Sequence, residues 1–273
     1  MDELYNKKNY FNPYYKYILN KYIREYDMRK SNISILYDKG IITLDDYIKL
    51  DNAPRQFRQV YIGKLILSNP KIQEILDKGV LEYKEKLFKA NNIKEYQVLT
   101  IKNDAVFIID KKLECTNFSS TIEFIPKNTY TSFYLLGNKN KKELYYYFNN
   151  MNYQEVLDVK GINDNMLFLY EDYLIEFFKV LFCTAQTESI KECIELLTSF
   201  IDQYRRLELD VEYYRRFDSD CMYDLMPTKV LGTYKVPFII DYQKYAININ
   251  HNLKLLLDLN KIFSDIYLTQ NKM

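Results

Sequence analysis

One carboxylate near the middle of the chain lies where it could do chemistry. Asp104 belongs to the stretch from Gln97 to Asp110, which reads Q-V-L-T-I-K-N-D-A-V-F-I-I-D and has one polar break between two β-prone runs. Asn and Asp tolerate left-handed backbone and bond their own main chain, so this break predicts a β-hairpin with Lys102, Asn103 and Asp104 at its turn. Asp104 would then project from an apolar platform, either as a metal ligand or as a solvated turn carboxylate.

Basic side chains on a predicted helix could bind phosphate. The segment R-Q-F-R-Q-V-Y-I-G-K-L-I-L has Arg55 and Arg58 on one face of a helix, with Lys64 further along it. The planar guanidinium fork of Arg suits the geometry of phosphate oxygens. The alternative interpretation is an exposed helix flank whose cations pair with the acids of the preceding segment.

Several further elements would have to position these side chains. Apolar spacing predicts a helix over residues 10–26, a short helix closed by Gly40, a helix opened by Thr43, and a long helix from Lys71 to Asn91. Residues 97 to about 160 instead have β-prone runs separated by turns, which predict an antiparallel meander of five to seven strands.

The order of helices, sheet and helices predicts an α+β fold. We expect N-terminal helices, a central antiparallel meander sheet with an early hairpin, and a C-terminal helical region. The corresponding regions are residues 1–96, helical; residues 97–162, a sheet packed on it; and residues 163–273, helical. With 273 residues and 48% apolar content, the chain can bury a sizeable core as one compact domain or two intimately packed ones.

Composition excludes several classes of protein. The 38 basic and 37 acidic residues give a net charge near +1, so no global field attracts nucleic acid or an anionic membrane. Four widely spaced cysteines and one histidine do not form a zinc pattern. We expect no membrane association and a cytoplasmic location, the host cytoplasm for a viral protein, because the sequence has no signal leader and no long apolar run.

From residue 55 to residue 162 the order of elements resembles the later part of the palm of template-directed DNA polymerases, especially the B family. That family has a basic fingers helix with a tyrosine and a glycine near its end, then a long palm helix and a hairpin with two carboxylates. A sheet and a lysine-glycine pair near the thumb follow. The counterparts here are Tyr61 and Gly63, the hairpin T-I-K-N-D-A-V-F, and Lys160 with the glycine after it.

The catalytic pattern of the hairpin is degraded. The second acid of the family pattern falls on Asp104, whereas the first acid falls on Lys102. For the family's other acid, on an earlier strand, the nearest counterpart is L-Y-D at residues 36–38. The resemblance implies a degenerate palm-like module or one part of a split polymerase, with Asp104 as its catalytic and metal-binding residue and Mg²⁺ as its cofactor. The residues it implies for nucleic-acid binding are Arg55, Arg58, Lys64 and Lys160.

Two hypotheses about function follow, and the sequence leaves open whether the protein is an enzyme. The first is a nucleic-acid-associated protein of viral or mobile-element origin with a degenerate or split palm-like module. The alternative is a non-enzymatic structural or protein-interaction protein of a phage or virus. Its tyrosine-rich surfaces would bind protein partners without any cofactor, because Tyr combines an apolar body with a polar tip.

Overall fold

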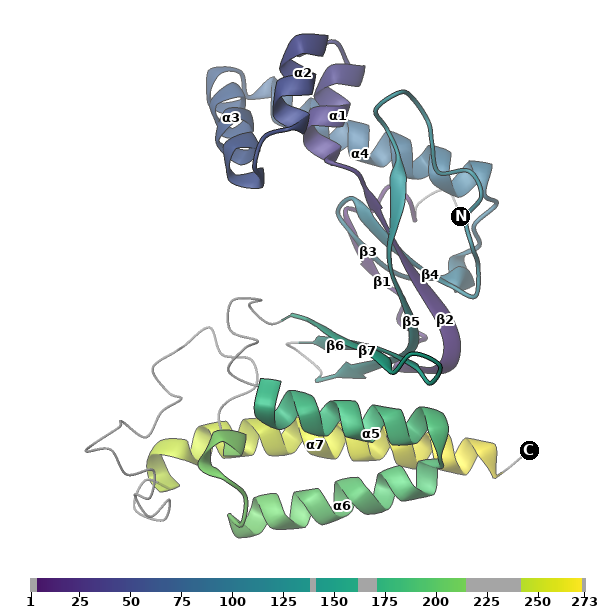
Figure 1. The fold of residues 1–273 in the computed structure, drawn as a ribbon, viewed down its shortest axis with the longest axis vertical. Helices are drawn as coiled ribbons and strands as arrows, with labels where there is room; N and C mark the ends of the chain where they lie inside the picture. Colours follow the sequence, from purple (N-terminus) through teal and green to yellow (C-terminus); the bar gives the residue numbers. More distant parts are fainter. Residues whose placement is uncertain (1–3, 138–140, 162–170, 215–241, 272–273) are drawn as a thin grey trace. The chain divides into compact units, whose positions relative to one another are not determined.

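The computed structural model describes residues 4–137, 141–161, 171–214 and 242–271 (Figure 1). The chain divides into two compact units. Unit 1 comprises Met1–Tyr14 and Tyr22–Thr129, and unit 2 comprises Tyr15–Lys21 and Tyr130–Met273. Each unit has its own hydrophobic core. Helices combined with an antiparallel sheet confirm the predicted α+β class.

The strands follow one another in the sheet in the order β1-β3-β4-β2-β5-β6-β7, and β2 and β5 contribute residues to both units. Strands β3 to β7 confirm the antiparallel strands predicted over residues 97 to about 160, but β2 lies between β4 and β5, so they do not form one uninterrupted meander. The strands are β1 (Asn9–Phe11), β2 (Tyr17–Met28), β3 (Val98–Lys102), β4 (Ala105–Ile109), β5 (Phe124–Leu136), β6 (Lys142–Asn149) and β7 (Gln154–Lys160).

The predicted helix over residues 10–26 is wrong, because most of this segment is strand β2. Tyrosines at three- and four-residue steps satisfy the helical period, but aromatic and β-branched residues also favour strands. Pairing with β4 decides between the two, with Ile23 opposite Ile109 and Asp27 opposite Ala105. Since β4 is distant in the sequence, local spacing could not reveal this pairing.

The predicted hairpin is confirmed. Strands β3 and β4 are antiparallel, with Lys102 opposite Ala105 across a two-residue turn. Asn103 adopts a φ of 53°, in the left-handed region that Asn tolerates, and its N–H donates to the Lys8 carbonyl at 2.8 Å. Lys102 belongs to strand β3, so the turn itself consists of Asn103 and Asp104.

Four helices of unit 1 confirm the sequence predictions. They are α1 (Ser31–Asp38), α2 (Leu44–Asp51), α3 (Arg55–Ser68) and α4 (Lys71–Ala90). Thr43 caps α2 by accepting the Asp46 N–H at 3.2 Å, and Gly40 after α1 has a φ of +68°. The apolar face of α4, including Val80 and Leu87, belongs to the same buried cluster as Val106 of β4.

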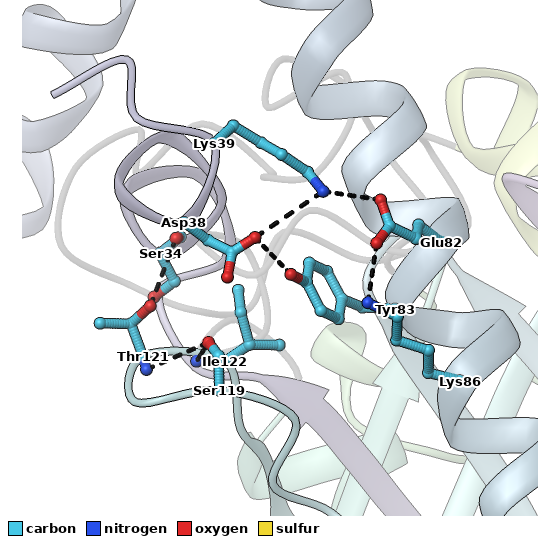
Figure 2. Close-up of polar contacts among 9 residues, drawn as sticks. All are labelled: Ser34, Asp38, Lys39, Glu82, Tyr83, Lys86, Ser119, Thr121 and Ile122. Carbon is cyan, nitrogen blue, oxygen red and sulfur yellow. Dashed lines mark hydrogen bonds and ion pairs between the residues drawn. The ribbon is translucent and has the colours of Figure 1, made fainter.

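Figure 2 shows a polar network between α1 and α4. The Tyr83 hydroxyl of α4 donates to the Asp38 carboxylate at the end of α1. The ammonium of Lys39 lies 2.7 Å from one Glu82 oxygen, and that of Lys86 lies 2.7 Å from the other. Burial, followed by the neighbouring Asp38, raises the pKa of Tyr83 and keeps its hydroxyl protonated as a donor.

Tyr83→Phe is expected to lower the free energy of unfolding by about 1.5 kcal/mol, because the Asp38 carboxylate loses its hydroxyl donor. Urea unfolding followed by circular dichroism would measure the change. Tyr14→Phe is the matched control, because Tyr14 is 86% exposed and its variant should stay within about 0.5 kcal/mol of the wild type. Equal stability of the two variants would contradict a stabilising role for the network.

Unit 2 packs helices against strands β5, β6 and β7. Its helices are α5 (Glu176–Thr187), α6 (Ile190–Arg206) and α7 (Tyr242–Gln270), and its core contains Tyr134 stacked on Phe182 with ring centroids 4.3 Å apart. Helix α6 ends at Arg206, and the next residue, Leu207, adopts a left-handed φ of 60°. Residues 163–170, 215–241 and 272–273 of the predicted C-terminal helical region lie outside the described residues. Within the described ranges, no helix has both the length and the apolar content needed to cross a membrane.

Candidate functional site

A pocket of about 390 Å³ in unit 1 brings together three of the residues selected from the sequence, Asp104, Arg55 and Arg58. The pocket lies where the end of β2, the start of α1, the first turns of α3 and the hairpin turn meet. The charged and hydroxyl side chains of its lining include Asp27, Lys30, Ser31, Arg55, Arg58 and Asp104.

The pocket contains two neighbouring carboxylates. Asp27 of β2 is opposite Ala105, the residue next to Asp104, and the Met28 N–H donates to the Asp104 carbonyl at 3.2 Å. Residues opposite one another in an antiparallel pair have Cα atoms about 4.5–5.5 Å apart, so the backbones of Asp27 and Ala105 lie side by side, and Asp104 is the next residue toward the turn. One oxygen of Asp104 accepts the Ser31 hydroxyl at 2.5 Å. In the described part of the chain, the other oxygen of Asp104 has no hydrogen-bond or ion-pair partner.

Three cationic side chains also line the pocket. Pro54 directly precedes α3, and its fixed φ is compatible with the start of a helix. Arg55 is therefore the first residue of α3, and Arg58 lies three residues further along the helix. The Arg58 guanidinium donates to the Ala53 carbonyl at 2.6 Å through one of its nitrogens. Lys30 is already paired, with its ammonium 2.6 Å from an Asp51 oxygen. Arg55 and Arg58 are therefore the cations best placed to receive an anionic ligand.

Two other predicted binding residues are not part of this pocket. Lys64 is on α3 and is exposed, but it does not line the pocket. Lys160 ends β7 in unit 2, where its ammonium lies 2.6 Å from an Asp158 oxygen. The structure thus groups Asp104 with Arg55 and Arg58 and separates these three from Lys64 and Lys160.

Sequence reasoning missed Asp27, the second acid of the pocket. The nearest counterpart that it offered, L-Y-D at residues 36–38, ends in Asp38, which belongs to the α1–α4 network instead (Figure 2). Asp27 directly follows the segment predicted as a helix over residues 10–26, and that prediction hid the pairing of β2 with the hairpin. A signal was present over residues 25–28, where Glu25 and Asp27 alternate with Tyr26 and Met28 as a strand with one apolar face requires.

Helix α4 contributes a buried cation, Lys84, which contacts the N-terminal segment and interacts with Asp104 of the hairpin turn. Lys84 has no exposed surface, and its ammonium donates to the Lys7 carbonyl at 2.8 Å. Burial lowers the pKa of Lys84 to about 8, although the Asp104 carboxylate partly opposes this shift. Asp104 therefore interacts electrostatically with a buried ammonium group.

The residues of the pocket fit a divalent cation only together with oxygens from a ligand. No group of three or more His, Cys, Asp or Glu side chains that could hold a metal ion occurs among the described residues. Mg²⁺ in proteins is commonly held by one or two carboxylates together with water and substrate phosphates. Asp27 and Asp104 match that smaller set in number, and the Lys127 ammonium lies 2.8 Å from an Asp27 oxygen.

Comparison with known proteins supports the viral origin predicted from the sequence. No curated protein matches the chain. The family described as Bacteriophage PBS1 gene 130 protein matches residues 1–265. Because this match covers nearly all of the 273 residues, the chain belongs to the family of Bacteriophage PBS1 gene 130 protein.

Proposed function

We propose that this phage protein associates with nucleic acid in the host cytoplasm and that unit 1 is a degenerate palm-like module. The observation that carries the proposal is the pocket that unites Asp27 and Asp104 with Arg55 and Arg58. Two carboxylates and two guanidinium groups in one pocket suit a ligand that carries phosphates, with or without a divalent cation.

The arrangement of elements supports this proposal. In the resemblance to the B family, the hairpin lacks its first acid because Lys102 occupies that position. Asp27 supplies a second carboxylate from the strand next to the hairpin, and α3 and α4 lie between β2 and the hairpin in the chain. A split or degenerate palm would need at least such a pair to retain a cation site.

The roles of the side chains follow from their contacts. Asp27 and Asp104 would hold Mg²⁺, which when bound would neutralise phosphate charge. The Ser31 hydroxyl fixes the orientation of Asp104 through its 2.5 Å hydrogen bond. Arg55 and Arg58 would bind phosphate oxygens, for which their planar forks are suited.

Arg55→Gln combined with Arg58→Gln is expected to weaken binding of single-stranded DNA or RNA at low salt. The slope of log affinity against log salt should fall by about 2, because two phosphate contacts are lost. Gel shifts of the full chain over a salt series would measure both effects. Lys64→Gln is the control on the same helix, and its effect should be smaller, because Lys64 does not line the pocket. An equal loss for Lys64→Gln would assign binding to α3 as a whole and not to the pocket.

Asp104→Asn separates binding from catalysis. The variant keeps the shape of the side chain and should bind nucleic acid as the wild type does. If the wild type incorporates nucleotides in the presence of Mg²⁺, the variant should lose that activity, because one of only two carboxylates loses its charge. Incorporation that survives in Asp104→Asn would remove this residue from the catalytic role.

A second candidate function, protein interaction, is favoured by one surface of α3. Phe57 and Val60 are each 58% exposed and Leu67 is 85% exposed, at spacings that align them along one helix face. The helix contains no acidic residue. If the full chain binds neither DNA nor RNA at low salt, the nucleic-acid proposal fails and protein interaction becomes the better account.

A further inference from the structure

Helix α3 carries apolar residues on two opposite sides, and only one of these sides packs in unit 1. All residues of α3 are described, and Ile62 is the only buried one, while Tyr61 and Leu65 pack partly against the same core. Helices α1 and α4 are neighbours of α3 in this unit (Figure 1). The apolar residues on the other side of α3 therefore do not contribute to the core.

The outer side of α3 has the spacing of a coiled-coil seam. Its members are Phe57, Val60, Lys64 and Leu67, at steps of three, four and three residues. An α-helix has about 3.6 residues per turn, so these four side chains align along one face. All four are exposed, Leu67 most of all at 85%. We call this face the α3 seam, and none of its four residues lines the pocket of unit 1.

The charges of α3 are all positive. Lys64 is the charged member of the seam, Arg55 and Arg58 add positive charge at the start of the helix, and the helix has no acidic residue. Within the described ranges, Lys64 forms no hydrogen bond or ion pair through its side chain. The α3 seam therefore combines exposed apolar side chains with a cation that the chain itself does not neutralise.

This combination selects a partner that is both apolar and acidic. A second copy of the chain would bring the cations of one α3 toward those of the other, and like charges at an interface are unfavourable. Nucleic-acid phosphates would pair with Lys64 but would leave Phe57 and Leu67 in water. A helix with an apolar stripe and a carboxylate facing Lys64 satisfies both parts of the seam, because Lys at a core position of a coiled coil specifies the partner.

We propose that the α3 seam binds an acidic amphipathic helix of another protein, with a carboxylate facing Lys64 and apolar side chains against Val60 and Leu67. This inference rests on the protein-interaction function proposed for α3 and names its partner class, and it does not depend on the pocket. The seam is about 15 Å long, a length that suits a transient contact.

The test is binding of a synthetic helical peptide to the full chain. The peptide has about three heptads with a Leu seam, one Trp in that seam, Glu at the position that faces Lys64, and Glu at the flanking positions, which keeps it from pairing with itself. Emission of the Trp reports binding directly, because the protein contains no Trp. The wild type should bind this peptide at least about tenfold more tightly than a matched peptide with Lys in place of Glu.

Two variants locate the binding on the α3 seam. Leu67→Ser should weaken binding of the acidic peptide about tenfold, because it removes an apolar contact. Lys64→Glu should reverse the preference, so that the basic peptide binds more tightly. Both positions are exposed, so both variants should fold, which circular dichroism checks. Leu268→Ser is the matched control, because Leu268 is 56% exposed on α7 of unit 2 and its variant should bind as the wild type does.

The inference stands if Leu67→Ser weakens binding and Lys64→Glu reverses the charge preference. Equal binding of the two peptides, still weakened by Leu67→Ser, would overturn the acidic partner and leave α3 as an apolar interaction surface. Absence of peptide binding, or binding that neither variant changes, would remove the inference together with the protein-interaction function of α3. Self-association or binding of single-stranded DNA that Leu67→Ser abolishes would assign the seam to a second copy or to nucleic acid, and would overturn the inference as well.

Discussion

Lys84→Met is expected to abolish a rise in stability that the wild type shows in alkaline solution. The folded protein releases the Lys84 proton above about pH 8, whereas the unfolded chain holds it up to the ordinary pKa of 10.5. Between these values the unfolded state binds more protons, so the free energy of unfolding rises with pH. The total contribution is about 3 kcal/mol, present in full above pH 10.5 and lost as the pH falls through about 8.

Urea unfolding of both proteins at intervals from pH 7 to pH 10.5 would measure this contribution. Other lysines and tyrosines titrate in both proteins, so the quantity of interest is the difference between wild type and variant at each pH. Lys78→Met is the matched control, because Lys78 is on the same helix with its side chain 80% exposed. Parallel stability curves for wild type and Lys84→Met would show that the ammonium is hydrated in the folded protein.

Gly79→Ala is expected to destabilise unit 1 by about 1–3 kcal/mol, the usual cost of overpacking a core. Helices α1 and α4 approach so closely at Gly79 that a Cβ atom there would lie 2.5 Å from Cγ2 of Ile35. Ile35 is fully buried and branched at Cβ, so it has little freedom to move aside. The close approach also lets the polar side chains of α1 and α4 reach one another (Figure 2).

Gly63→Ala, on the neighbouring helix α3, is expected to raise the free energy of unfolding, in contrast to Gly79→Ala. A Cβ at Gly63 of α3 would meet no atom within 4 Å, so alanine should stabilise the protein by about 0.5–1 kcal/mol through its better helix propensity. Thermal or urea unfolding of the two variants would compare them directly. A stabilised Gly79→Ala would mean that α1 and α4 can separate without cost.

Only the fold shows which two acids, Asp27 and Asp104, line the pocket. In the hairpin itself, Lys102 occupies the position of the first acid of the polymerase pattern and Asp104 that of the second. The hairpin sequence alone therefore offers a single acid. The second carboxylate, Asp27, belongs to a strand that pairs with the hairpin from far along the chain. Lys127 reaches the same acid from another distant segment, so three separate parts of the sequence meet at one position.

The sequence by itself determined the features that depend on local chemistry. The Asn-Asp turn of the hairpin, the Thr43 cap, the glycine after α1 and the long amphipathic helix α4 were all predictable, because each depends on neighbouring residues. The basic start of α3 was predictable for the same reason.

Only the tertiary structure decided which of these features form a site. Strand β2 has tyrosines at helical steps, and its pairing with β4 decides that this segment is a strand. The same pairing brings Asp27 and the hairpin turn to one pocket, whose lining does not include Lys64 or Lys160. The physical reason is that strand pairing is a long-range interaction, so the partners of a side chain in a sheet are set by register and not by sequence spacing.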